Sequence, residues 1–161
     1  MNTFAKYQKV GFTLIEVTLA LGVAGFCLTT LFGLLPVALN SNRAAIEQTA
    51  ANSILSAVIS DLRATPSSLP RGTAVSSQQY AIDIPASGVA GSNTLYFNSE
   101  RQKVASASTG RYLVSISFLA PPSGSGPKTA AMAAIRVAWP ASASIANAAG
   151  SVETFTALDR N

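Results

Sequence analysis

The sequence contains no histidine and only one cysteine, and each shortage argues against a class of protein. Histidine is the side chain that most often serves as a general base and as a metal ligand. Its absence argues against most hydrolases and most metal-dependent enzymes. The one cysteine, Cys27, has no partner for an intrachain disulfide, and we expect it to be a small apolar filler. The fold must therefore be held together by packing alone.

Motifs that carry chemistry are also missing from the sequence. It has no glycine-rich phosphate loop and no Ser-His-Asp arrangement. The basic residues are scattered, although the net charge is +4, and this pattern is not typical of a nucleic-acid-binding protein. We therefore expect a protein that is not an enzyme, needs no cofactor or metal and binds no nucleic acid. Five acidic residues are too far apart in sequence to suggest a site and are expected to be solvated surface charges: Asp61, Asp83, Glu100, Glu153 and Asp159.

A long uncharged stretch dominates the N-terminal part of the chain. No charged residue occurs from Val17 to Asn42. The 23 residues from Val17 to Leu39 are enough to span a bilayer, which takes about 20 apolar residues. Lys6 and Lys9 precede this stretch, and the positive-inside rule places them in the cytoplasm and the C-terminal bulk outside. An ordinary secretory signal would have a shorter apolar core and a small-residue cleavage site beyond it.

One acidic residue, Glu16, lies at the start of this apolar segment. A carboxylate at the edge of a membrane span costs a few kcal/mol unless it finds a partner. A plain signal anchor that is never cut would not need such a residue. The sequence therefore favours a segment in which Glu16 has a task, although an uncleaved, membrane-anchored periplasmic binding domain remains the alternative.

The heptapeptide GFTLIEV at residues 11–17 resembles the processing motif of type IV prepilins and of the pseudopilins of type II secretion systems. In that family a membrane-embedded peptidase cuts after the glycine and methylates the new N-terminus, and the glutamate serves assembly. The resemblance implies that Gly11 is the last leader residue, Phe12 the methylated N-terminus and Glu16 the assembly glutamate. It also implies that Glu16 meets the terminal amine of a neighbouring Phe12.

Two further stretches resemble narrower groups of the same family. The run RVAWP at residues 136–140, followed by a late strand, is similar to minor pilins of the V type and to I-type minor pseudopilins. The run FTLIEVTLALGVAGF, followed by LFGLLP at residues 31–36, resembles the prepilin-like proteins called Verru/Chthon cassette protein B. The partners implied are prepilin peptidase, other pilin or pseudopilin subunits, an inner-membrane assembly platform and membrane lipid. The implied location is the bacterial inner membrane, single pass with a periplasmic C-terminal domain, and then a pilus or pseudopilus.

The first 65 residues divide into a leader at 1–11, a membrane and assembly helix at 12–42 and an amphipathic continuation at 43–65. Pro36, inside the apolar helix, favours a kink, and glycines there allow close helix packing. The continuation is expected to end at Thr65-Pro66. Its apolar residues recur at helical spacing and predict a face that packs on a domain: Ile46, Ala50, Ile54, Ala57, Val58 and Leu62.

Residues 66–161 are expected to form a β-rich globular domain, because alternation with period two replaces the helical period. A hairpin is predicted from Thr94–Asn98 and Lys103–Ser106, with a loop at Pro121–Pro127. Trp139 is expected to be a core or interface aromatic. The other predicted strands are Gln79–Ile84, Arg111–Leu119, Ala133–Trp139 and Val152–Leu158. A long N-terminal membrane-spanning helix packed on a small antiparallel sheet is an α+β, pilin-like fold.

Overall fold

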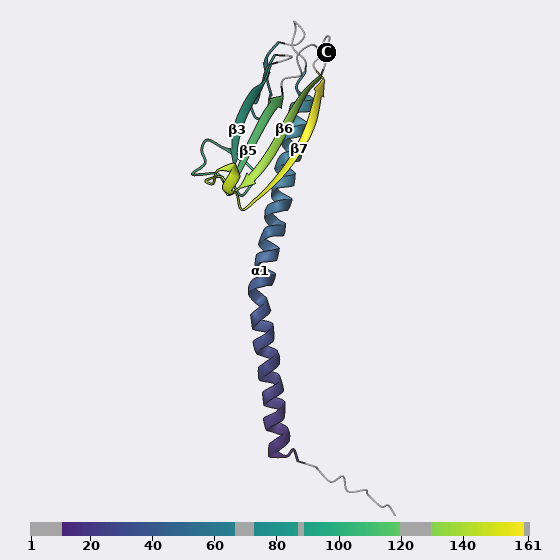
Figure 1. Ribbon diagram of the computed structural model, residues 1–161, viewed down its shortest axis with the longest axis vertical. Helices are drawn as coiled ribbons and strands as arrows, with labels where there is room; N and C mark the ends of the chain where they lie inside the picture. Colours follow the sequence, from purple (N-terminus) through teal and green to yellow (C-terminus); the bar gives the residue numbers. More distant parts are fainter. Residues whose placement is uncertain (1–10, 67–72, 87–88, 120–129, 160–161) are drawn as a thin grey trace, which may run out of the picture. The chain divides into compact units, whose positions relative to one another are not determined.

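The computed structural model describes residues 11–66, 73–86, 89–119 and 130–159. The chain divides into two compact units, one ending at Arg43 and the other beginning at Ala44. Helix α1, Leu14–Ala64, runs through both units and is the purple-to-blue helix of Figure 1. It ends where the sequence predicts, before Thr65-Pro66. It begins two residues later than the expected Phe12, because Thr13 caps it.

The first unit contains the apolar part of α1, from Leu14 to Arg43. Every described side chain in this part is exposed, including large apolar ones such as Phe26 at 74% and Phe32 at 69%. Pro36 lies inside the helix, which continues on both sides of it. By length and hydropathy this helix is able to cross a membrane, a property that signal sequences share.

The second unit is an antiparallel sheet covered on one face by the remainder of α1. Its strand order is β4-β3-β5-β6-β7, and its four longer strands are labelled in Figure 1. The strands are β3 Gly91–Phe97, β4 Lys103–Val104, β5 Tyr112–Leu119, β6 Ala130–Trp139 and β7 Gly150–Asp159. A separate two-stranded sheet pairs β1, Val75–Ser76, with β2, Asp83–Ile84, and a short 3-10 helix, Ile145–Asn147, precedes β7. The predicted α+β class is confirmed.

The core lies between α1 and one face of the sheet. From the helix come Ala51, Ile54, Val58 and Leu62, each no more than 2% exposed. The sheet contributes alternate residues of its strands, because successive side chains point to opposite faces. The inward residues that the alternation predicts on β5 and β6 are buried, namely Tyr112, Val114, Ile116, Phe118, Ile135 and Val137. Leu113 and Ala138, which face the other way, are buried as well.

Trp139 closes one end of this core. Its ring stands edge-on to Tyr112 with centroids 6.3 Å apart, which confirms the expected core role. Gly150, opposite Trp139 in the β6–β7 pairing, leaves room for the indole. A Cβ atom at position 150 would lie 2.3 Å from Trp139 Cζ2, so only glycine fits there.

The structure corrects three predictions about this unit. Ile46 is 60% exposed and does not join the core, because the buried stripe of α1 begins at Ala51. The predicted strand Gln79–Ile84 is reduced to β2, since Gln79 and Tyr80 form a turn.

The predicted hairpin is present, with β3 and β4 pairing Tyr96 to Val104 and Phe97 to Lys103. The predicted loop Pro121–Pro127 lies outside the described residues.

The third correction concerns Asp61, which is buried rather than solvated, with 6% of its surface exposed. Its two carboxylate oxygens accept hydrogen bonds from the backbone N–H groups of Gln79 at 3.0 Å and Tyr80 at 3.1 Å. This pairing explains the turn that replaces the predicted strand. Asp83, Glu100 and Glu153 are exposed as predicted, whereas the side chain of Asp159 is outside the described set.

Candidate processing and assembly site

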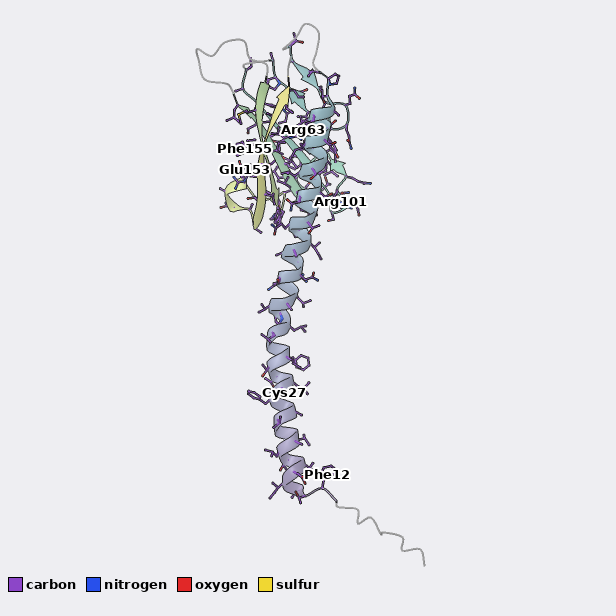
Figure 2. All side chains as sticks on the ribbon, turned by 90° about the vertical axis from the view of Figure 1, so that its right-hand side faces the viewer. Phe12, Cys27, Arg63, Arg101, Glu153 and Phe155 are labelled. Carbon is purple, nitrogen blue, oxygen red and sulfur yellow. The ribbon has the colours of Figure 1, made fainter. Side chains whose placement is uncertain are left out.

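The three residues singled out by the sequence, Gly11, Phe12 and Glu16, lie at the start of α1. Gly11 and Phe12 precede the helix in irregular backbone. The Phe12 side chain is 84% exposed and is labelled at the lower end of the helix in Figure 2. The peptide bond between Gly11 and Phe12 therefore lies outside the helix.

Glu16 takes part in a reciprocal cap with Thr13. Thr13 donates from its backbone N–H to Glu16 Oε2 at 3.3 Å and from its hydroxyl to the same oxygen at 3.2 Å. In return the backbone N–H of Glu16 donates to Thr13 Oγ1 at 3.3 Å. This arrangement is a capping box, which satisfies donors that would otherwise be unpaired at a helix start. The negative charge of Glu16 also faces the positive end of the helix dipole.

The sequence interpretation missed Thr13. The signal was present, because a threonine followed three residues later by glutamate, just before an apolar run, predicts a helix N-terminus. Glu16 thus has a local task that does not require another chain. A plain, uncleaved anchor would therefore also have a use for Glu16, as a helix cap.

A shallow apolar hollow on the helix surface brings Phe12 and Glu16 together. Small residues lie one and two turns further along the face that carries Glu16, at Ala20 and Ala24. Small side chains on one face allow another helix to approach closely. The hollow is lined by Phe12, Glu16, Val17, Ala20, Leu21 and Ala24.

The polar contacts of the second unit attach α1 to the sheet rather than forming a reactive site. Glu47 pairs with Arg111, and the Arg63 guanidinium donates to Thr156 Oγ1 from Nε at 3.3 Å and from Nη2 at 3.1 Å. Burial, and then the nearby Glu47 carboxylate, raise the pKa of Tyr112 above its usual value. These contacts fix the helix at both ends of its buried stripe.

Among the described residues, no group of three or more His, Cys, Asp or Glu side chains lies close enough together to hold a metal ion. Cys27 is exposed on α1.

The chain matches no protein-family model, no curated protein and no solved structure. The architecture is pilin-like: a long apolar N-terminal helix whose later part packs on an antiparallel sheet.

Proposed function

We propose that the chain is a minor pilin-like or pseudopilin subunit that prepilin peptidase processes between Gly11 and Phe12. It is then built with other pilin or pseudopilin subunits, at an inner-membrane assembly platform, into a pilus or secretion filament. The subunit acts by packing and is not an enzyme. The observation that carries the proposal is that one continuous helix is exposed and carries no charge from Val17 to Asn42, and then completes the core of a domain from Ala51 onward.

During assembly, the helices of neighbouring subunits replace the lipid that surrounds the apolar helix. Lipid tails are as apolar as leucine side chains, so close packing and polar pairing must supply the attraction. Glu16 supplies a charge in a low-dielectric environment, and a terminal amine at Phe12, created by cleavage, is its complement. An unpaired buried charge is costly, and pairing removes that cost. The small residues Ala20 and Ala24 lie on the same face and allow the approach.

The alternative is an uncleaved, membrane-anchored periplasmic binding domain. The capping box favours it, because Glu16 already has a partner in Thr13. In that case Glu16 only starts the helix, and the apolar segment only anchors the domain.

The N-terminus of the mature chain distinguishes the two functions. Intact mass measured on native membranes, from cells with an active prepilin peptidase, is expected to show a chain that begins at N-methylated Phe12. Recovery of chains that all retain Met1 would contradict the proposal and leave the anchored domain as the answer.

Two substitutions separate the charge of Glu16 from its capping role. Glu16→Gln keeps an acceptor oxygen for the capping box and removes the charge, whereas Thr13→Val removes the capping hydroxyl and keeps the charge. Both chains are expected to insert and to be cut. In cross-linking with co-expressed pilins, Glu16→Gln is expected to lose incorporation and Thr13→Val to retain it. The reverse result would mean that Glu16 acts only as a cap.

A further inference from the structure

Strand β7 forms one edge of the five-stranded sheet and is ten residues long. It pairs with β6 along its whole length, from Gly150 opposite Trp139 to Asp159 opposite Ala130. In an antiparallel pair, every second residue turns its N–H and C=O groups away from the partner strand. Within the described ranges, no backbone group of β7 is hydrogen-bonded to the backbone of anything other than β6. Figure 2 looks onto this side of the sheet.

The opposite edge is protected in two ways. The short strand β4 pairs with the end of β3, and Asn93 of β3 exchanges side-chain hydrogen bonds with the backbone of Asp83 at 2.7 and 3.2 Å. Natural proteins usually blunt an exposed edge with charge, proline or a bulge, because a free edge recruits other strands. The described part of β7 contains no proline and pairs with β6 without a bulge. Its one charge with a described side chain is Glu153.

The two sides of β7 offer different side chains to an added strand. On the helix side, exposed Arg63 bonds to Thr156 and also lines an open groove along α1 with Ser56, Ile59, Ser60 and Ala64. On the outer side, Phe155 is 60% exposed and Met132, on the neighbouring strand, is 53% exposed. In Figure 2 Arg63 is labelled to one side of the strand and Phe155 to the other. The edge therefore presents the Arg63 cation on the helix side. Its outer side presents apolar surface at Phe155 and Met132 beside the exposed carboxylate of Glu153, which lies opposite Arg136 of β6.

We propose that β7 is a docking edge for an extended segment of another protein, which adds a strand to the sheet. The segment presents an acidic side chain to Arg63 and apolar side chains to Phe155 and Met132. Main-chain hydrogen bonds give such strand addition its affinity, and alternate side chains give it specificity.

Charge complementarity argues against a second copy of β7 as the occupant. The helix-facing residues of β7 are all uncharged, namely Val152, Thr154, Thr156 and Leu158. Pairing two copies would bring one Arg63 toward another, with no acidic side chain from β7 between them. An extended segment of a different protein that carries an acidic side chain would pair with Arg63 instead.

The test uses the full chain in detergent micelles and three labelled eight-residue peptides. The first alternates threonine and valine with a central glutamate on the threonine side. The second replaces the glutamate with lysine. The third keeps the glutamate but is N-methylated on alternate backbone nitrogens, which blocks strand pairing. Binding is measured by fluorescence anisotropy at low salt, and the protection of β7 amides by hydrogen exchange.

The glutamate peptide is expected to bind about fivefold or more tightly than the lysine peptide, the scale of a partly exposed charge pair. It should slow exchange at alternate β7 amides, and the N-methylated peptide should not bind. Arg63→Gln is expected to remove the preference for glutamate, whereas Arg101→Gln, at an exposed cation in the β3–β4 turn, should keep it.

Equal binding of the N-methylated peptide, or unchanged exchange at β7, would overturn the proposal. Protection of β7 that grows with protein concentration without peptide would show that a second copy occupies the edge, which also contradicts it. The inference does not depend on cleavage after Gly11, so it stands or falls separately from the proposed function.

Discussion

At the scale of single residues, Asp61 is a buried carboxylate at a position that the helix dipole disfavours. An acidic residue in the last turn of a helix faces the negative end of the helix dipole. Asp61 is nevertheless buried there, because its two oxygens bind the backbone N–H groups of Gln79 and Tyr80. Charge-assisted bonds of this kind are stronger than those between neutral groups. The residue ties the end of α1 to the segment that leads into β2.

The substitution Asp61→Asn is expected to destabilise the second unit. The amide replaces one acceptor oxygen with a donor, so one partly buried N–H group loses its partner, at a cost of about 1 kcal/mol, the lower end of the range for buried groups. Urea unfolding followed by the fluorescence of Trp139, the one tryptophan of the chain, measures the change. Asp83→Asn, at an exposed position, serves as the control and should stay within about 0.5 kcal/mol of the parent. Equal stability of the Asp61→Asn variant and the parent would mean that the two hydrogen bonds contribute nothing.

At the scale of elements, the strands with the clearest alternation were predicted well. Strand β5 begins one residue later than predicted, and its inward residues are the predicted ones, because period two is a local property of the sequence. The short strands β1 and β2 depend on a turn that Asp61 holds from 18 and 19 positions away along the chain. No local pattern contains that information. The edge position of β7 is likewise a consequence of strand order, which alternation does not specify.

The start of α1 shows the opposite situation. The spacing of Thr13 and Glu16 predicts the cap from the sequence alone, whereas the resemblance to prepilins concerns only Glu16 of this pair. The sequence predicts that the buried stripe of α1 begins at Ile46, but it begins at Ala51. Helical periodicity identifies a face of the helix but not the point at which the sheet stops covering that face. The fold class was therefore accessible from the sequence, whereas the partners of individual polar residues required the tertiary structure.

The outer part of α1 is expected to be indispensable to the sheet. A fragment beginning at Pro66 lacks Ala51, Ile54, Val58 and Leu62, all buried in the core. Burial of each large apolar side chain contributes about 1.5–3 kcal/mol, so their loss is comparable with the whole stability of a domain, about 5–15 kcal/mol. We expect the fragment 44–161 to unfold cooperatively and the fragment 66–161 to aggregate or to show no cooperative transition. If both fragments unfold at the same urea concentration, α1 does not complete the core.

At the scale of the whole molecule, the two units have opposite relations to their surroundings. The residues from Leu14 to Arg43 are exposed without exception, and most of them are apolar. The buried core residues all lie beyond this segment, the first being Ala51. Under the proposed function, this separation would allow the helix to move from lipid into a bundle of helices without changing the packing of the domain.

The full chain in detergent micelles and the fragment 44–161 are therefore expected to unfold at the same temperature. The described residues 11–43 contribute no buried side chain to the core, so removing the segment before Ala44 should change the free energy of unfolding by less than about 1 kcal/mol, or about 4 °C for a domain of this size. Near-ultraviolet circular dichroism, which reports the packing of Trp139 and Tyr112, follows the domain in both samples. The fragment is measured in the same detergent, so that any effect of the micelle on the sheet is common to both. A midpoint substantially higher in the full chain would show that the apolar segment supports the domain, and moving that segment between lipid and a filament would then alter the domain itself.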